Sequence, residues 1–488
     1  MKTLFLILFS AFALTHQLSS QWVYQQPPVN TSYYITMDFT TVNIGAAGGV
    51  FLSSDFFGRA AYTSNSGINW LTSTVPDSLR VITKIVFINS TTAFCSGAYN
   101  LDTTAFLPET HRYDKRTLQL LPQYQSSGGN NYKGLFMRST NAGISWSPYG
   151  TLPANVYYLK GLHFVNANTG FASAAYDPSG GVNDGVIKTT NAGLTWSALS
   201  MPEIINNLTG VYFNDINTGY AVGYDRVNDT ARGLILRTTN SGASWSRQVF
   251  SNAGEISGIS FTNVTTGLAV SLASPFLSEP EAALLKTTNA GLNWFLVNTF
   301  EDVDLFNVDF VEGTSTALIY GTKYLPSFEN ADFVAKSVNS GTNWIEQPIG
   351  INGCLLFDAE LLDLNNWYLT GGTFGSVTSP VILHTTNGGA LGIQPVTGEI
   401  PLNYSLQQNY PNPFNPVTNI KFSIPEAGFV KLVVFDVTGK EVSTLISHSM
   451  KAGNYVVDFD ASSLTSGVYF YKLTSGSYIN TKRMILVK

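Results

Sequence analysis

The chain contains little charge and little cysteine. Asp, Glu, Lys and Arg make up 12% of its 488 residues, whereas aromatic residues reach 13%. This balance, together with abundant Gly, Ser, Thr and Asn, favours turn-rich all-β structure over helices. The two cysteines, Cys95 and Cys354, allow at most one disulfide, and nothing indicates a redox or metal role for them.

Long apolar runs are missing everywhere except at the N-terminus. There, Lys2 precedes an apolar run from Leu4 to Leu14, and small or polar residues follow near Ser19-Ser20. This is the pattern of a secretory signal peptide, and the run is shorter than the ~20 apolar residues that a membrane span needs. We therefore expect residues 1–20 to be a signal peptide, the chain to be exported, and no transmembrane segment to be present.

Basic residues are the minority in most of the chain. Residues 1–399 contain 18 Lys and Arg against 27 Asp and Glu, a balance of −9, whereas residues 400–488 contain 8 against 5, a balance of +3. An acidic main body argues against nucleic acid as a partner.

One motif occurs seven times: a hydroxyl residue, any residue, Asn, any residue and Gly, usually with Trp three residues later. Thr189-Thr-Asn191-Ala-Gly193-Leu-Thr-Trp196 is one copy. Successive Asn residues lie 76, 50, 49, 49, 50 and 48 positions apart, which is the period of a four-stranded propeller blade. The seven are Asn65, Asn141, Asn191, Asn240, Asn289, Asn339 and Asn387.

Each repeat also contains an inner-strand signature, in which an apolar residue and one variable residue precede Phe. The seven predicted positions are Phe39, Phe87, Phe164, Phe213, Phe261, Phe310 and Phe357. A hairpin such as Asn166 to Ala172 follows, in which we expect Gly170 to take the positive φ of a tight turn. Each blade then runs through inner strand, turn, second strand, third strand, motif and outer strand with Trp.

Two irregularities at the ends of the repeat explain each other. The seventh motif, Thr385 to Gly389, lacks its Trp, whereas Trp22 has no motif before it and lies 48 residues ahead of Trp70. We therefore predict that the segment from Trp22 to Gln25 supplies the outer strand of the last blade, which closes the ring and removes a free sheet edge.

The predicted fold class is all-β. Residues 21–392 are expected to form a seven-bladed β-propeller closed by the N-terminal strand, followed by a small Ig-like β-sandwich. In this arrangement one blade separates Cys95 from Cys354, so we expect two unpaired, half-buried thiols.

The motif residues have a structural explanation. An Asn side chain and a Ser or Thr hydroxyl can bind backbone N–H groups of the turn, Gly allows a left-handed residue, and Trp covers the turn. Seven copies of a turn are expected in a repeat fold, whereas seven copies of an active site are not.

The repeats resemble the Asp-box, or BNR, repeats of sialidase-like and sortilin-like propellers, with Asn in the Asp position. With this spacing and the Thr-Gly-Phe/Tyr-Ala hairpins, they are most similar to the photosystem II assembly or stability factor-like propellers. The resemblance covers residues 22–392 and implies the fold. It implies no function, because enzymes, receptors and assembly factors share such repeats.

The propeller is predicted to end in a polar connector, residues 393–409, which contains Pro395, Gly398 and Pro401. Residues 410–488 then alternate as expected for a small β-sandwich. The predicted strands are Asn419–Ile424, Val430–Asp436, Tyr455–Phe459, Val468–Leu473 and Arg483–Val487.

This C-terminal segment resembles the type A sorting domain of the type IX secretion system, with an ordinary Ig-like module as the alternative. The matching residues are Tyr410, Pro411, Asn412 and Pro413; Asp436 and Gly439; Gly467 and Tyr469; and Lys482 and Arg483. The resemblance implies the type IX machinery as a partner. It also implies passage across the outer membrane, removal of the tail, and release or anchoring at the cell surface.

No set of titratable residues indicates catalysis. A sialidase would need an arginine cluster, a Tyr–Glu pair and an acid/base Asp, and the chain lacks the Phe-Arg-Ile-Pro signature. Arg138 and Arg237 precede the motif hydroxyl, at a strand position that is basic in most repeats. We interpret this position as structural, with binding of an anionic glycan or lipopolysaccharide as the alternative.

Asp38, His163 and Asp309 share the variable position before the inner-strand Phe. They are candidates for lining the ring interior, although contact with the neighbouring blade or solvent is the stronger expectation. Sequence cannot place the two carboxylates of a glycosidase, about 5–10 Å apart, in the central cleft. The acidic residues between Glu301 and Glu312 lack EF-hand spacing, so we predict no metal and no cofactor.

The second repeat carries about 26 extra residues, within roughly Tyr99 to Lys133. Charged and aromatic residues are dense there, and long insertions on a rigid scaffold often carry binding function. A ligand-binding surface and a hairpin without a partner both remain open. The candidate ligand-binding residues are His111, Arg112, Tyr113, Lys115, Arg116 and Tyr124.

We therefore expect a non-enzymatic, monomeric propeller that binds a protein or glycan at the cell surface or outside the cell. The alternative is a secreted glycan-active hydrolase, sialidase-like or otherwise. The hydrolase predicts that a pair of acidic residues converges in the central cleft, whereas the binding protein predicts a shallow aromatic or charged surface around the insertion. Assembly of a pigment–protein complex would conflict with export past the outer membrane.

Overall fold

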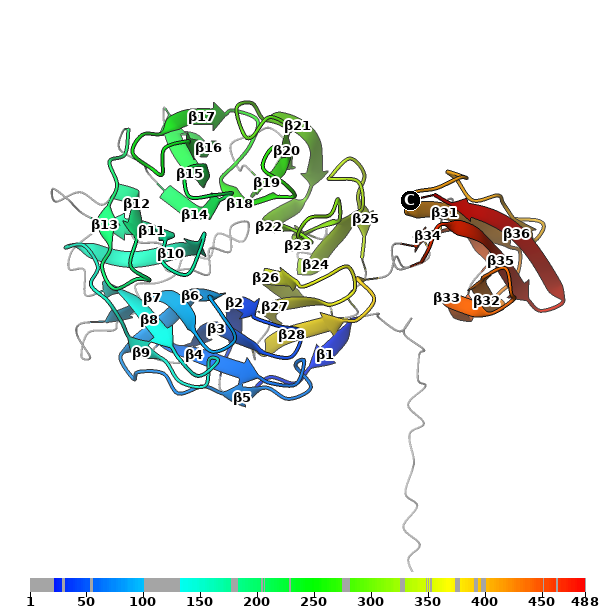
Figure 1. Ribbon diagram of the computed structural model, residues 1–488, viewed down its shortest axis with the longest axis horizontal. Coiled ribbons are helices and arrows are strands. Elements are labelled where there is room, and N and C mark those ends of the chain that lie inside the picture. The colour runs from blue at the N-terminus through cyan, green and yellow to red at the C-terminus, as the bar shows by residue number, and fades with distance from the viewer. Residues whose placement is uncertain are drawn as a thin grey trace, which may run out of the picture. The chain divides into compact units, whose positions relative to one another are not determined.

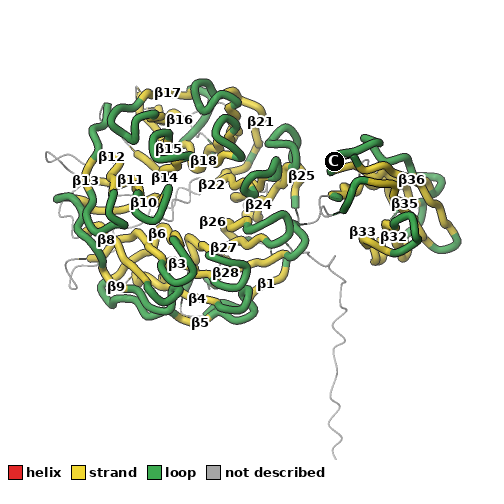
Figure 2. Tube along the Cα trace, in the orientation of Figure 1, coloured by secondary structure: helices red, strands yellow, loops and turns green. Residues whose placement is uncertain are grey.

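A computed structural model describes residues 22–28, 31–52, 56–100, 132–176, 183–202, 205, 207–227, 230–273, 281–324, 330–347, 349, 351, 353–373, 378–389, 394–395, 401–450, 452–461 and 464–487. The predicted signal peptide lies outside these residues. The chain divides into two compact units, residues 1–389 and 390–488. Among the described residues the secondary structure consists of strands joined by turns and loops, without a helix (Figure 2).

The first unit contains seven antiparallel sheets of four strands, arranged around a common axis as the blades of a propeller (Figure 1). The sheets, called blades one to seven, are β2 (Tyr33–Phe39), β3 (Gly45–Leu52), β4 (Phe56–Thr63) and β5 (Leu71–Thr72); β6 (Leu79–Phe87), β7 (Ala93–Asn100), β8 (Tyr132–Ser139) and β9 (Ser147–Pro148); β10 (Val156–Phe164), β11 (Gly170–Tyr176), β12 (Asn183–Thr189) and β13 (Ser197–Ala198); β14 (Asn207–Phe213), β15 (Gly219–Val227), β16 (Thr230–Thr238) and β17 (Ser246–Phe250); β18 (Ile256–Phe261), β19 (Gly267–Ser271), β20 (Glu281–Thr287) and β21 (Phe295–Glu301); β22 (Val303–Phe310), β23 (Ala317–Tyr324), β24 (Asn330–Ser337) and β25 (Ile345–Glu346); and β26 (Cys354–Leu361), β27 (Trp367–Thr373), β28 (Pro380–Thr385) and β1 (Val23–Gln25).

The N-terminal strand belongs to the last blade. β1 pairs antiparallel with β28, with Val23 opposite His384 and Gln25 opposite Ile382. Trp22, just before β1, is buried and packs against Trp367 with the ring centroids 6.5 Å apart. The prediction that the N-terminal segment supplies the outer strand of blade seven is confirmed.

The inner strands share one register, which corrects one predicted position. The last residue of each inner strand pairs with the first residue of the second strand, as Phe310 does with Ala317. In blade seven the residue that pairs with Trp367 is Leu361, so the assignment of Phe357 was wrong. Phe357 instead lies at a β-bulge four residues earlier, a position that is also irregular in the other inner strands.

The hairpin glycine has a different role from the predicted one. Gly170 is not among the residues of positive φ. A Cβ atom at this position would lie 2.8 Å from ring atoms of Phe164, so the glycine is required by the aromatic side chain that covers it. The same contact involves Phe213 at Gly219, which explains why the Gly and the Phe occur together.

Each motif turn is held by local hydrogen bonds. In blade three, Thr189 Oγ1 accepts from the Gly193 N–H at 3.0 Å, and Asn191 Oδ1 accepts from the Thr195 N–H at 2.9 Å. Ala192 and Gly193 are both left-handed, with φ of 56° and 81°. The bond from the Gly N–H to the hydroxyl recurs at Gly67, Gly143, Gly193, Gly242, Gly291, Gly341 and Gly389.

The cores of the first unit lie between adjacent blades. Trp196 of blade three packs edge-on against Phe136 of blade two at 5.1 Å and against Phe164 of its own blade at 6.1 Å. Cys95 and Cys354 are free thiols, as predicted. Both are fully buried instead of half-buried, because they lie on the inward-packed strands β7 and β26.

The second unit consists of two four-stranded sheets that enclose one apolar core. The first sheet has the order β29 (Gln394–Pro395), β34 (Gly453–Asp460), β31 (Val417–Ile424) and β30 (Ser405–Leu406), and the second β33 (Glu441–Met450), β32 (Gly428–Phe435), β35 (Gly467–Ser475) and β36 (Tyr478–Leu486). The predicted strands are all present, and β33 was missed. The short strands β29 and β30, within the predicted linker, pair with β34 and β31.

Candidate functional site

The two ends of the propeller differ. In blade three the N–H of Ala192, in the motif turn, donates to the carbonyl of Asn168, in the first hairpin, at 2.8 Å. The motif turns and the first hairpins therefore share one end of the sheets, which we call the motif end. The inner strands run towards the motif end, so the variable residue before each terminal Phe or Leu lies close to it.

Seven side chains occupy this variable position around the axis. They are Asp38, Val86, His163, Tyr212, Ser260, Asp309 and Glu360. Two residues earlier, on the same face of each strand, lie Thr36, Lys84, Gly161, Gly210, Gly258, Asn307 and Asp358. Most of the charged members lie in blades six, seven, one and two, which makes one side of the axis strongly polar.

Several of these side chains bind the backbone of the next blade. Asp38 accepts a short hydrogen bond from the N–H of Phe87, and Ser260 Oγ accepts from the N–H of Phe310 at 3.3 Å. His163 makes the corresponding bond with the backbone of Phe213. The expectation that this position contacts the neighbouring blade holds for Asp38 and His163.

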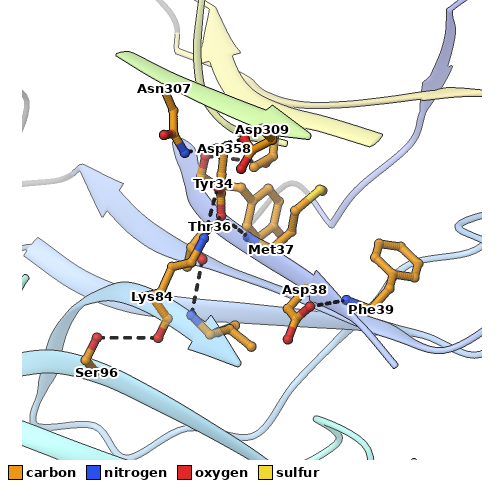
Figure 3. A network of polar contacts seen from close by, with 12 residues as sticks. Tyr34, Thr36, Met37, Asp38, Phe39, Lys84, Ser96, Asn307, Asp309 and Asp358 are labelled. Carbon is orange, nitrogen blue, oxygen red and sulfur yellow. Dashed lines mark hydrogen bonds and ion pairs between the residues drawn. The ribbon is translucent and has the colours of Figure 1, made fainter. Parts of the chain in front are cut away.

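Lys84 and Asp358 form an ion pair across an intervening blade (Figure 3). Lys84 Nζ lies 3.0 and 2.8 Å from the two carboxylate oxygens of Asp358, whose side chain is 4% exposed. The N–H of Met37, in blade one, donates to the same carboxylate at 3.0 Å. Asp358 therefore joins blades seven, one and two.

Asp309 and Glu360 depart from the blade-to-blade pattern. Asp309 accepts from Tyr320 Oη at 2.8 Å and from Asn307 Nδ2 at 3.4 Å, both within its own blade. Within the part of the chain that the structure describes, Glu360 makes no side-chain hydrogen bond. Both carboxylates line a pocket of about 300 Å³ at the motif end, which we call the axial pocket. Its lining residues are Phe39, Asp309, Phe310, Glu312, Ala359, Glu360, Leu361 and Leu362.

The acidic residues of this region hold their protons unusually tightly. Burial raises the pKa of Asp309 to about 7, and the charge of Asp358 adds to the rise, while Lys84 opposes it. Burial and the charge of Asp38 raise the pKa of Glu360 well above its usual range. Burial raises the pKa of Asp38 itself to about 7, against its hydrogen bond from Phe87. Burial is the largest cause for all three groups, and the charge of neighbouring carboxylates adds to it.

This arrangement can act in two chemical ways. Ionised Asp309 and Glu360 accept hydrogen bonds and attract a cationic group, and the axial pocket has three carboxylates in its lining and no basic residue. A protonated carboxyl group with a pKa near 7 can also donate a proton at neutral pH. The described residues include no group of three or more His, Cys, Asp or Glu side chains placed to hold a metal ion.

The mostly basic strand position before the motif hydroxyl contacts the next blade. Lys188 Nζ donates to Ser241 Oγ at 2.6 Å, and Lys336 Nζ donates to the Gly388 carbonyl at 2.9 Å. Arg237 makes a similar bond to the motif turn of blade five. These cations join neighbouring blades, which favours the structural interpretation of the position over binding of an anionic glycan.

The predicted ligand-binding insertion lies outside the described residues. Its candidates, His111, Arg112, Tyr113, Lys115, Arg116 and Tyr124, all fall within residues 101–131. The flanking strands end at Asn100 and begin at Tyr132, at the end of the sheet opposite the motif turn. The insertion therefore starts and finishes at the other end of the propeller from the axial pocket.

Lys84, Asp358 and Glu360 were not predicted as site residues. Glu360 was missed because Phe357 had been taken as the end of the inner strand. A usable signal was present in the sequence: in blades two to five an Asn or Asp of the first hairpin follows the terminal Phe by two positions, as Asn89 follows Phe87. Counting back two from Asp363 gives Leu361, and Glu360 then aligns with Asp309.

In the second unit, the residues of the sorting motif hold the ends of the sheets. Asn412 Oδ1 accepts from the Ile485 N–H on β36 at 2.9 Å. Asp436 accepts from the backbone of Thr438 and Lys440 in the turn that contains left-handed Gly439. Gly467 begins β35, Tyr469 Oη donates to a backbone carbonyl, and Lys482 and Arg483 lie on β36, whereas Tyr410 is 79% exposed.

Among solved structures, the chain is similar to YCF48 bound to D1 peptide, at 12% identity and a TM-score of 0.48, over 76% of this chain and 96% of that chain. It is similar to the GH74 xyloglucanase from Xanthomonas campestris at 11% identity and a TM-score of 0.47, over 94% of this chain and 75% of that chain. It is also similar to PorZ, a surface component of the type IX secretion system of Porphyromonas gingivalis, at 12% identity and a TM-score of 0.48, over 95% of this chain and 60% of that chain. No ligand or activity carries over from likenesses this distant.

No curated protein matches the chain. Among the described residues, no helix is long and apolar enough to cross a membrane. Residues 408–488 match the family model of the secretion system C-terminal sorting domain, which covers 81 of the 99 residues of the second unit. The C-terminal unit is therefore a type IX sorting domain, and it directs this propeller protein to the cell surface or the extracellular space.

Proposed function

We propose that this protein is an exported binding protein whose propeller takes a basic group of a protein or peptide ligand into the axial pocket. The observation that carries the proposal is the composition of the pocket, in which Asp309, Glu312 and Glu360 meet without a basic residue. Opposite charge attracts the ligand and fixes its orientation, whereas an anionic glycan would be repelled.

The existing ion pair explains why further cations are attracted. Lys84 is already bound to Asp358, so it neutralises only part of the acidic region. Burial, and after it the charge of nearby carboxylates, raises the pKa values of Asp309 and Glu360. A lysine or arginine side chain placed between them would restore the charge balance and allow both to ionise. Binding is therefore expected to release protons at neutral pH.

The insertion in blade two is a second proposed contact surface. We propose His111, Arg112, Tyr113, Lys115, Arg116 and Tyr124 as its ligand-contacting residues. We propose that the protein acts as a monomer with either surface.

The test measures binding of the full-length chain to an array of lysine- and arginine-containing peptides and to a panel of neutral and acidic glycans. It is made at pH 8, above the pKa of Asp309. Asp309→Asn and Glu360→Gln should each weaken peptide binding about tenfold. Glu301→Gln, a matched change at an exposed residue of β21, should have no effect. Binding to the glycans alone, or peptide binding unaffected by the two pocket variants, would refute the proposal.

A second candidate, a glycan hydrolase, is favoured by one observation. Two carboxylates of raised pKa, Asp309 and Glu360, line the same pocket, and glycosidases use one protonated and one ionised carboxyl group. The same glycan panel therefore needs a second readout, the release of reducing sugar. Release that disappears in both Asp309→Asn and Glu360→Gln would establish this candidate, and no release from any substrate would exclude it for that panel.

A further inference from the structure

Two arginines share one aromatic ring between blades one and two. The guanidinium carbon of Arg59, on β4, lies 5.2 Å from the ring centroid of Phe57, and that of Arg80, on β6, lies 5.3 Å from the same centroid. Arg59 also lies 6.0 Å from the ring of Phe51. Two positive charges therefore meet at one place in a chain that has few charges.

Neither arginine has an acidic partner among the described residues. Arg80 is 9% exposed, and within the described residues it donates one hydrogen bond, from Nη1 to the backbone carbonyl of Asp77 at 3.1 Å. Its Nε is buried and has no acceptor within the described part of the chain. Arg59 donates from Nη1 to the Gly58 carbonyl at 3.2 Å.

Three other partly buried cations among the described residues of the propeller lie beside a carboxylate. Lys84 pairs with Asp358, Lys160 pairs with Asp184 at 2.6 Å, and Arg247 pairs with Asp225. A guanidinium that is removed from water without a counter-charge is costly, so proteins rarely keep one without use. Arg80 has no such carboxylate partner among the described residues, and it shares with Arg138 a buried Nε that has no acceptor there.

Stacking on Phe57 does not replace a counter-charge. The ring attracts the face of a guanidinium, but the N–H donors of arginine lie in its plane and point away from the stack. Stacking fixes the orientation of the guanidinium group. Its in-plane N–H donors then match the geometry of a carboxylate, phosphate or sulfate group. Both guanidinium groups lie around the same Phe57 ring, with their carbons 5.2 and 5.3 Å from its centroid.

We propose that Arg59 and Arg80 form a binding site for an oxyanion, the carboxylate, phosphate or sulfate group of a small ligand. Arg80 is the second residue of β6 and Arg59 the fourth of β4, and both strands start at the end of the sheets opposite the motif turns. The site is therefore distinct from the axial pocket, takes ligands of the opposite charge and does not depend on the proposed function. It lies at the same end as Asn100 and Tyr132, where the insertion starts and finishes.

The experiment uses the full-length protein and follows its Tm in phosphate, sulfate and glucuronate, each against sodium chloride at equal ionic strength. A saturable rise of about 2–4 °C is expected for at least one oxyanion, and calorimetry should give a Kd of roughly millimolar size. Comparing the three anions distinguishes an inorganic tetrahedral group from a sugar carboxylate.

Variants locate the site. Arg59→Gln should weaken binding about tenfold, and Arg80→Lys, which keeps the charge but loses the planar fork, should also weaken it. Arg80→Lys is preferred to a neutral variant because Arg80 is buried and its loss could affect folding. Arg138→Gln is the matched control, because Arg138 stacks alone on Tyr149 at 5.1 Å and lies next to a motif turn.

Three results would overturn the proposal: no saturable effect of any of the three anions on the wild type, unchanged affinity in Arg59→Gln, or an equal loss in Arg138→Gln. The last result would show that general positive charge, and not this pair of arginines, attracts the anion. Calorimetry on the folded variants at 25 °C measures the affinity for the anion directly, so the result does not depend on any change in the Tm of the variants.

Discussion

Lys84 and Asp358 are 274 positions apart in the sequence, yet Lys84 Nζ lies 2.8 Å from Asp358 Oδ2 beside the propeller axis. They belong to blades two and seven, and blade one lies between them. Because the N–H of Met37 in blade one also binds Asp358, one carboxylate connects the last blade to the first two. The beginning and the end of the repeat are thus joined both by the β1–β28 pairing and by this polar contact.

The first prediction concerns this ion pair. Lys84→Met should lower the free energy of unfolding by about 2–4 kcal/mol, because it leaves the buried Asp358 carboxylate without its cation. Asp358→Asn in the same chain should restore most of the loss, since the amide needs no counter-charge. Lys323→Met, which breaks an exposed pair with Glu346, should cost about 1 kcal/mol or less. Urea denaturation measures all of these changes.

If the double variant were as unstable as Lys84→Met alone, the loss would come from packing of the lysine side chain and not from an unpaired charge. The side chain of Lys84 is 33% exposed, which is why we expect less than the full cost of breaking a buried pair.

The second prediction concerns pH. Asp309 has a pKa of about 7 in the folded protein against 3.8 in the unfolded chain, so the folded state holds its proton more tightly. The stability that this provides is fully present below about pH 4 and is lost as the pH rises through 7. Asp309→Asn should therefore leave stability unchanged at pH 4 and raise it at pH 8. Because Asp309 is partly exposed, we expect a gain of about 1–2 kcal/mol.

Asp363, in the same blade as Glu360, is a control whose contribution to stability should change with pH in the opposite direction. Partial burial raises the pKa of Asp363, but hydrogen bonds from the side chain of Asn366 and the backbone of Asn365 and Asn366 outweigh it, and the net pKa is lowered. Its contribution is present above the unfolded pKa and is lost as the pH falls. Asp363→Asn should therefore destabilise at pH 7, and equal behaviour of the two variants across pH would contradict the assignment.

The repeat and the N-terminal strand could be predicted from sequence because their causes are local. A motif turn needs the same hydroxyl, Asn and Gly in every blade, and Trp22 had to belong to the one motif without a Trp. The role of Gly170 could not be predicted, because its cause is the ring of Phe164 folded back over it and not its own backbone conformation.

The axial site could be predicted only in part. Asp38 and Asp309 were recognised by their shared position, but the partner of Lys84 depends on which blades surround the axis and on a register that shifts at a bulge in each inner strand. In blade seven the terminal Phe is replaced by Leu361, and Phe357 in the bulge offered a false match. The charge distribution at the axis depends on the arrangement of the blades and on the register of their inner strands. The period of the sequence repeat does not give either of these.

The third prediction tests the corrected role of the hairpin glycine. Gly170→Ala should destabilise by about 1–3 kcal/mol, because the added Cβ would lie 2.8 Å from ring atoms of Phe164. Phe164→Leu alone should also destabilise, but adding Gly170→Ala to it should cost much less than in the wild type, since a smaller side chain leaves room. Thermal denaturation of the four proteins of this cycle gives the coupling. Additive effects would mean that backbone conformation, and not the ring, requires glycine.

The fourth prediction concerns the N-terminal strand. Trp22→Ala should lower the free energy of unfolding by about 3–5 kcal/mol, because Trp22 is 4% exposed and packs against Trp367. β1 is held by only three residue pairs, so loss of Trp22 should also release it from β28 and uncover a sheet edge. Limited proteolysis should then cut residues 22–28 under native conditions, and the variant should aggregate at lower temperature than the wild type. Trp294→Ala, the equivalent change in blade five, should cost a similar free energy without exposing an N-terminal cleavage site, because its outer strand β21 has seven residues where β1 has three. Cleavage at the N-terminus that is equally fast in both variants would show that β1 opens independently of Trp22.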